Sequence, residues 1–191
     1  MHALRLLAVS GSLRGASTNT ALLRAAAKIA PPSISMSIYD GLDRLPIFNP
    51  DLEKREPVAP VLDVRRRVLD ADGLVIACPE YAHGIPGGLK NALDWLVSGA
   101  EIPGKPVALF HASPRSSHGR FALTEVLRTM SAQVVFEFTL PLLGLTPEAV
   151  AHRLAEPDHI AAIRDALSLF AERIGPPWSR RELSHMRDVE P

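Results

Sequence analysis

Several features that commonly point to a function are missing from this sequence. Its 191 residues contain one cysteine, which excludes an internal disulfide framework and suits a reducing compartment. Basic and acidic residues number 21 each, so the formal net charge is zero and no basic surface for nucleic acid is indicated. No apolar run approaches the roughly 20 residues of a membrane span, and no signal-peptide pattern is evident. We therefore expect a cytoplasmic protein with no nucleic-acid or membrane partner.

What the sequence contains is ordinary for a globular domain, with 47% hydrophobic and 22% charged residues. Short apolar runs of strand length alternate with longer helical patterns. The candidate strands are Leu4–Val9, Ile34–Tyr39, Gly73–Cys78, Pro106–Ala112 and Gln133–Phe138. The candidate helices are Asn19–Ala30, Pro60–Asp70, Pro86–Val97, Arg120–Met130 and Pro157–Ile174.

This alternation predicts an α/β fold with crossover connections. Three of the strands are almost continuously apolar, as strands covered by helices on both faces are. Five such units favour a flavodoxin-like doubly wound five-stranded parallel sheet of order 2-1-3-4-5, with helices on both faces. We expect one domain over residues 1–175 and a peripheral tail over 176–191, after a helix stop signal at Gly175. The long connection over residues 40–57 is expected to be functional or mobile.

Polar side chains gather in the first predicted strand-to-helix turn, GSLRGASTNT (Gly11–Thr20). In a sheet of this order, ligands bind beyond the carboxyl ends of the first and third strands. The unpaired N–H groups that begin the following helix favour an anion there. The Walker lysine and the GxGxxG fingerprint are both absent. A helix cap explains one polar residue of the turn, whereas a terminal phosphate explains Ser12, Arg14, Ser17, Thr18 or Thr20, and Asn19.

Glycine and proline dominate the turn after the third strand, CPEYAHGIPGGLKNALDW (Cys78–Trp95). Pro86 can begin a helix, where its missing N–H costs nothing. Gly84 allows either a positive φ or the close approach of a flat ligand. A flat aromatic cofactor lying on this backbone and a plain tight turn are both compatible with these residues.

Together the two turns resemble a known family. GSLRxxSxN after the first strand and PEYxxGxPGxLKNALDW after the third are similar to motifs of the NADPH-dependent FMN reductases, which include quinone, azo-dye and chromate reductases. The resemblance covers Leu4 to Val135, and LPIFNPDLE (Leu45–Glu53) resembles the family's loop after the second strand. It implies a flavodoxin-like fold with non-covalently bound FMN.

The resemblance also assigns site residues. It implies that the FMN phosphate lies against Ser12, Arg14, Ser17 and Asn19, with Thr20 as a further candidate. It implies that the isoalloxazine ring lies against Pro79, Glu80, Tyr81 and Gly84, mainly through their backbone. In the turn after the fourth strand, the family usually has a serine and a Gly-Gly pair near the pyrimidine edge of the ring. Ser113 matches the serine, but Pro114-Arg115 stands in place of Gly-Gly.

The activity implied is that of an FMN-dependent NAD(P)H oxidoreductase. NADPH or NADH would be the electron donor, and the acceptor a quinone, free flavin, azo compound or chromate. No catalytic side chain is expected, because the flavin carries the redox chemistry. The family also implies a homodimer or homotetramer. Two alternatives are a non-catalytic flavodoxin-type electron carrier, which is expected to be acidic around its flavin, and a phosphate-sensing module without flavin.

The remaining reactive side chains have plain interpretations. Cys78 is expected to be an inert buried thiol, and His83 to face solvent. Scattered histidines and a single cysteine indicate no metal site. Trp95 and the leucines of its helix are expected in the core or a subunit interface, with the apolar tip LPIF (45–48) as a second contact surface.

Overall fold

The computed structural model describes residues 3–55, 58–115, 117–142 and 144–174. Within them, five strands form one parallel sheet in the order β2-β1-β3-β4-β5, which confirms the predicted flavodoxin-like topology. Each strand ends within a residue of its predicted bounds. The strands are β1 (Leu4–Ser10), β2 (Ile34–Tyr39), β3 (Gly73–Ala77), β4 (Pro106–His111) and β5 (Gln133–Thr139). The predicted tail over 176–191 lies outside the described residues.

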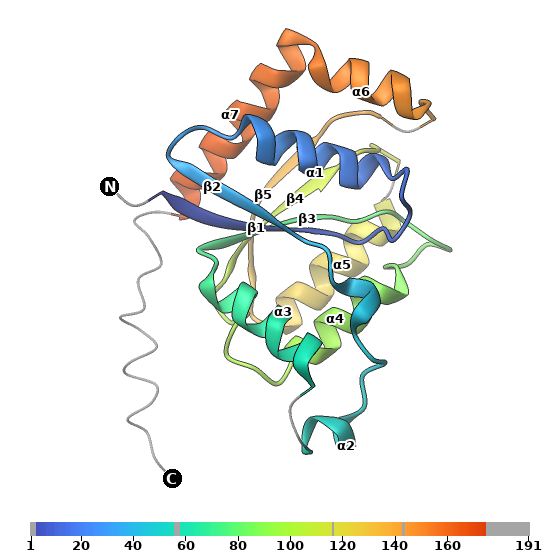
Figure 1. Ribbon diagram of the computed structural model, residues 1–191, viewed down its shortest axis with the longest axis vertical. Helices are drawn as coiled ribbons and strands as arrows, with labels where there is room; N and C mark the ends of the chain where they lie inside the picture. Colours follow the sequence, from blue (N-terminus) through green and yellow to red (C-terminus); the bar gives the residue numbers. More distant parts are fainter. Residues whose placement is uncertain (1–2, 56–57, 116, 143, 175–191) are drawn as a thin grey trace.

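Helices cover both faces of the sheet (Figure 1). One face carries α1 (Thr18–Ile29), α6 (Pro147–Ala155) and α7 (Pro157–Ile174). The other carries α3 (Ala59–Asp70), α4 (Gly87–Leu96) and α5 (Ser117–Thr129). Two short elements, the 3₁₀ helix η1 (Leu42–Arg44) and α2 (Pro50–Glu53), lie between β2 and α3. Within the described part of the chain, no helix combines the length and the apolar character that crossing a bilayer requires.

Three elements were not predicted from the sequence: η1, α2 and α6. In α6 only Val150 and Leu154 are buried, so its apolar periodicity is too short to stand out. Its start is nevertheless well defined, because Thr146 caps it by accepting the N–H of Ala149 at 3.3 Å and Pro147 occupies the first turn.

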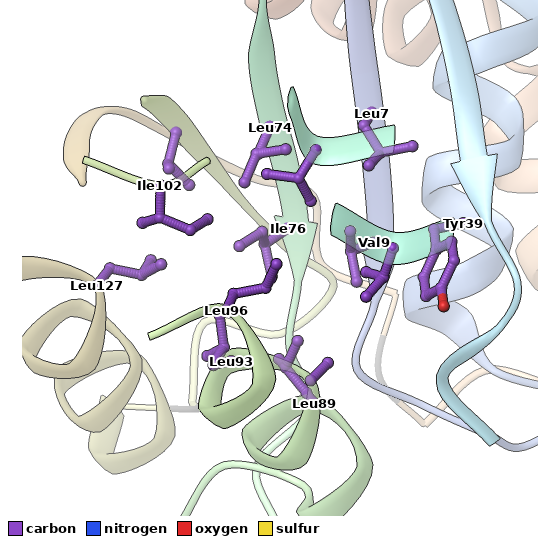
Figure 2. Close-up of a cluster of buried hydrophobic side chains, with 14 of the residues drawn as sticks. Leu7, Val9, Tyr39, Leu74, Ile76, Leu89, Leu93, Leu96, Ile102 and Leu127 are labelled. Carbon is purple, nitrogen blue, oxygen red and sulfur yellow. The ribbon is translucent and has the colours of Figure 1, made fainter. Parts of the chain in front are cut away.

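The core consists of two apolar layers, one on each face of the sheet. Alternate residues of β1 and β3 point in opposite directions, so Leu7 and Ile76 join the layer toward α4 and α5, while Leu6 and Val75 join the layer toward α1 and α7. Figure 2 shows the first of these layers, with Leu89 of α4 packed below the sheet. Burial on both faces explains why the central strands read as continuous apolar runs.

In the long connection between β2 and α3, residues 46–48 are fixed against α4. The carbonyl oxygen of Pro46 accepts hydrogen bonds from the Asn91 amide at 2.9 Å and the Trp95 indole at 2.8 Å. The Asn91 amide oxygen also accepts the N–H of Phe48 at 2.7 Å, and the Phe48 ring packs edge-on against Trp95. Trp95 is 1% exposed, so it belongs to the core rather than to a contact surface.

Candidate functional site

A cavity of about 760 Å³ opens at the carboxyl ends of the central strands. Strand order reverses between β1 and β3, and the turns after these two strands and after β4 all contribute to its walls. Most of the residues predicted to bind a cofactor meet here: Ser12, Arg14, Ser17, Asn19, Pro79, Glu80, Tyr81 and Ser113 line the cavity. Two predicted residues, Thr20 and Gly84, are not part of its lining.

The first wall is the polar turn between β1 and α1. Ser17 is the N-cap of α1, and its hydroxyl accepts the N–H of Thr20 at 3.3 Å. The Thr20 hydroxyl is paired with that of Ser10 at 2.7 Å, which ties the helix start to the end of β1. Ser12 turns the chain by accepting the N–H of Arg14 at 3.3 Å. Thr20 therefore holds the shape of the turn, while its neighbours face the cavity.

The start of α1 makes this wall suitable for an anion. Ser17 and Asn19 are buried polar residues that line the cavity, together with Thr18 of the first helical turn. N–H groups at the beginning of a helix lack partners within it, and the helix dipole is positive there. The exposed Arg14 adds a formal positive charge to the same wall.

The second wall is the segment Pro79–Tyr81, which leads into a tight hairpin turn. The N–H of Tyr81 donates to the carbonyl oxygen of Gly84 at 3.2 Å, and the N–H of Gly84 donates back to that of Tyr81 at 2.9 Å. The two central residues have positive φ angles, 48° at Ala82 and 61° at His83. This is the geometry of a type I′ turn, in which asparagine and glycine are usual.

The turn corrects one expectation about Gly84. Its φ is not positive, because a type I′ turn places the left-handed angles on its two central residues. A Cβ at Gly84 would meet only the carbonyl oxygen of Tyr81, at the ordinary distance of 3.6 Å. The backbone freedom of glycine is thus not needed at this position, and a contact between Gly84 and FMN stays a prediction.

Glu80 connects the second wall to α5. Its Oε2 accepts the N–H of Gly119 at 2.8 Å, and the approach is close, since a Cβ at Gly119 would lie 3.2 Å from the Cβ of Glu80. A side chain at position 119 would therefore displace Glu80 by a few tenths of an ångström, which favours glycine here. The carboxylate of Glu80 thus anchors this wall of the cavity to the first turn of α5.

The third wall follows β4 and includes a buried histidine that the sequence analysis did not select. His111 is 5% exposed and lines the cavity beside Ser113. Its Nε2 lies 3.4 Å from Oε2 of Glu137 without hydrogen-bond geometry, and Arg120 pairs with the same oxygen at 3.2 Å. Burial lowers the pKa of His111; Glu137 opposes this effect and Arg120 adds to it.

The expected buried thiol is confirmed at Cys78, which also lines the cavity. Burial raises the pKa of this thiol to about 12, and the nearby Glu80 carboxylate acts in the same direction. The thiol is therefore protonated at neutral pH, the form in which cysteine is a poor nucleophile.

A fourth wall of the cavity was not predicted from the sequence, because helix α6, which forms it, was not predicted. Its residues, with the loop before them, close the cavity on the side of α1, where Arg24 also joins the lining. They are Gly144, Leu145, Pro147, Val150, Ala151 and Leu154. The sequence TPEAV (146–150), a capping threonine followed by proline and glutamate, was the available signal for this helix.

The family model of the NADPH-dependent FMN reductases matches residues 4–142. The chain belongs to this family. A quinone reductase of Escherichia coli K12 is 34% identical over 138 residues, covering 69% of this chain and 73% of the relative. An NAD(P)H-dependent FMN reductase of Pseudomonas aeruginosa is 36% identical over 146 residues, covering 75% of this chain and 73% of the relative.

Solved structures agree with the fold of an FMN reductase. The flavoenzyme FerB of Paracoccus denitrificans, an NAD(P)H:(acceptor) oxidoreductase, superposes with a TM-score of 0.72 over 90% of this chain and 97% of its own. Sequence identity is 23%, so this likeness concerns the fold alone.

The cavity fits the cofactor for which the family is named. A phosphate needs several donors, and hydroxyl, amide and guanidinium groups from the first turn face the same space as the helix start. A flat ring needs a backbone surface to lie against, and Pro79, Glu80 and Tyr81 at the end of β3 line the cavity wall. Both requirements are met within a single cavity at the switch point of the sheet.

Proposed function

We propose that this protein is an FMN-dependent NAD(P)H oxidoreductase that reduces a small-molecule acceptor, with quinones as the first class to test. One observation carries the proposal: the phosphate-type donors of the first turn and the flat segment after β3 line one cavity. Several relatives are named for quinone reduction, which supports quinones as the first class, and the name of the Pseudomonas aeruginosa FMN reductase supports flavin as the second.

The first turn would hold the phosphate. Ser12, Arg14, Ser17 and Asn19 supply hydroxyl, guanidinium and amide donors, and the α1 N-terminus supplies backbone N–H groups. Because Ser17 also caps the helix, the same side chain fixes the position of those N–H groups. A terminal phosphate is bound this way at its three oxygens, which favours FMN over FAD.

The walls after β3 and β4 would position the ring. When bound, FMN supplies the two-electron redox chemistry, taking electrons from the nicotinamide and giving them to the acceptor. The backbone at Glu80 and Tyr81 orients the flat face, and Glu80 keeps this segment in place through its bond to Gly119. Cys78 stays protonated beside the ring and takes no part as a nucleophile. The chain thus contributes binding and orientation.

Flavin binding and turnover test the proposal directly. Purified protein would be freed of cofactor, titrated with FMN by fluorescence quenching, and then assayed for NADPH and NADH oxidation with benzoquinone. We expect stoichiometric FMN binding and quinone-dependent oxidation that needs the flavin. FMN binding without steady turnover would favour the electron-carrier alternative. Absence of any flavin binding would contradict the proposal and leave the phosphate-sensing alternative.

Two further properties belong to this proposal. We place the protein in the cytoplasm, supported by its single cysteine, which cannot form an internal disulfide. We also propose a homodimer or homotetramer, supported by the family membership and by the 86% exposed Ile47 at the tip of the fixed β2–α3 connection.

A further inference from the structure

Three side chains capable of binding a metal ion converge outside the cavity. Glu80, His83 and His118 come from the turns after β3 and β4, and one ligand atom of each lies within 4.8 Å of the other two. The sequence analysis treated the histidines as scattered, because 34 positions separate the two that meet here. Neither histidine lines the cavity, so the proposed flavin chemistry gives them no role.

The fold sets the backbone positions of all three and anchors the Glu80 carboxylate. His83 is carried on the type I′ turn, with φ of 61°, and its ring stacks on that of His118 with centroids 4.2 Å apart. His118 lies in the first turn of α5, next to the Gly119 N–H that fixes Oε2 of Glu80. The other carboxylate oxygen of Glu80, Oε1, is left 3.7 Å from Nδ1 of His118.

The turn that carries His83 is an unusual one. Both of its central residues adopt left-handed angles without being glycine, and Ala82 is not among the other residue types enriched there. Such conformations persist where the surrounding structure over-determines them, and they cluster at ligand clamps and functional sites. In this turn the conformation directs the imidazole toward α5.

Two imidazoles and one carboxylate form a ligand set that zinc uses with water in a fourth position. Ligands about 2.1 Å from a tetrahedral ion are about 3.4 Å from one another, so the three groups need to draw together. Both histidines are exposed, so one imidazole can rotate out of the stack while Glu80 stays anchored. Their exposure also gives the ion a path from solvent.

We propose that Glu80, His83 and His118 bind a divalent transition-metal ion, with Zn²⁺ as the ion of choice. The ion joins the turn after β3 to the beginning of α5, on the outer side of the cavity wall that Glu80 lines. Imidazole nitrogen and a single carboxylate favour Zn²⁺, Co²⁺ or Cu²⁺ over Mg²⁺ and Ca²⁺, which prefer oxygen ligands.

Titration of the full chain, produced without a histidine tag, tests this site. Calorimetry with ZnCl₂ should show one ion per chain, and Co²⁺ should give the visible absorption bands of a tetrahedral site. The measurement uses protein without flavin, so failure of the proposed oxidoreductase activity would not affect it.

Three variants remove ligands with little effect on the fold. His83→Asn keeps a residue that accepts left-handed φ, His118→Ala alters an exposed helix residue, and Glu80→Gln keeps an oxygen for Gly119. Each should weaken Zn²⁺ binding by at least about tenfold, since even partners of ligands are worth that much. Circular dichroism would confirm that each variant is folded.

The matched control is His152→Ala on α6. His152 is 83% exposed and lies beside Glu156, so it tests whether any surface histidine near a carboxylate gives the same signal. Its Zn²⁺ affinity should equal that of the parent. The proposal would be overturned if the parent bound no Zn²⁺ or if the ligand variants kept the parental Zn²⁺ affinity. It would also be overturned if His152→Ala lost as much Zn²⁺ affinity as His83→Asn.

Discussion

Arg14 and Ser17 lie in the same turn but have separable roles at the scale of single residues. Ser17 is buried and caps α1, so its loss would disturb both the helix and the cavity. Replacing such a cap by alanine costs about 1 kcal/mol of stability. Arg14 is exposed at the cavity wall, so its substitution reports on binding with little effect on folding.

Arg14→Ala should weaken FMN binding about tenfold to a hundredfold, because a charge-assisted bond to phosphate contributes about 1.5–3 kcal/mol. Fluorescence titration measures the affinity, and the melting temperature of the apo protein should stay at the parental value. Arg128→Ala is the control, since Arg128 is an exposed arginine of α5 paired only loosely with Glu125. Equal FMN affinity in Arg14→Ala and the parent would remove Arg14 from the phosphate.

Lys105 is a buried cation whose ammonium donates to the carbonyl oxygen of Ala71, at the end of α3, at 2.7 Å. Burial lowers its pKa from 10.5 to about 8, while Asp72 opposes the shift. Between these two values the unfolded chain binds more protons than the folded one, so stability rises with pH. Below about pH 8 Lys105 is charged in the folded state as well, so the folded state is destabilised by the full cost of burying that charge.

Lys105→Met removes this titration, so the parent should gain stability relative to the variant as pH rises. The difference in the free energy of unfolding, parent minus variant, should increase by about 3 kcal/mol from near pH 7 to 10.5. Urea unfolding at several pH values measures it, and other titrating groups cancel in the difference. A difference that does not change with pH would mean that Lys105 keeps its charge at no cost.

At the scale of elements, substitutions in the turn Tyr81–Gly84 can distinguish the effect of backbone strain from the effect of a lost cofactor contact. Ala82 has a φ of 48°, and Gly84 lies outside the left-handed region with room for a Cβ at an ordinary contact distance. The same substitution at the two positions therefore tests different things.

Ala82→Val should lower the apo melting temperature, because a β-branched residue at positive φ costs about 1–3 kcal/mol. Gly84→Val should leave apo stability close to the parent and weaken FMN binding, if the ring lies against this residue as the family resemblance implies. Apo melting curves and FMN titrations of both variants measure these effects. Parental FMN affinity in Gly84→Val would place the ring elsewhere on the wall.

The central strands β1, β3 and β4 could be predicted within a residue because their apolar runs have a single cause, burial on both faces of the sheet. The polar turn before α1 could also be recognised in the sequence as a candidate site, since Ser12, Arg14 and Asn19 are unusual together at a helix start. The strain at Ala82 could not be predicted, because alanine is not among the residue types that favour a left-handed angle. The α6 wall and the pair His83–His118 depend on tertiary packing, which local pattern does not encode.

At the scale of the whole molecule, the exposed apolar groups suggest where copies would meet. Trp95 is excluded by its burial, whereas Ile47 stands exposed on a connection that Asn91 and Trp95 hold rigid. A rigid apolar tip loses little entropy on association, which suits it to an interface.

Light scattering at micromolar concentration should therefore return a dimer or tetramer rather than a 20.7 kDa monomer. Ile47→Glu should shift the distribution toward monomer, because it places a charge in the buried centre of the contact. Leu169→Glu, at an exposed position of α7, is the control and should leave the assembly unchanged. A monomeric parent would contradict the proposed oligomer.

The packing of α7 has a consequence for how the chain is made. Arg164 of α7 donates to the carbonyl oxygen of Ile29 at the end of α1, 135 positions earlier, and a Cβ at Gly73 would lie 2.8 Å from Ile174. Helix α7 thus completes a layer whose other members, such as Leu6, are synthesised earlier. Until residues 157–174 emerge, the part of this sheet face that α7 covers stays exposed, and such apolar surface is what chaperones shield during synthesis.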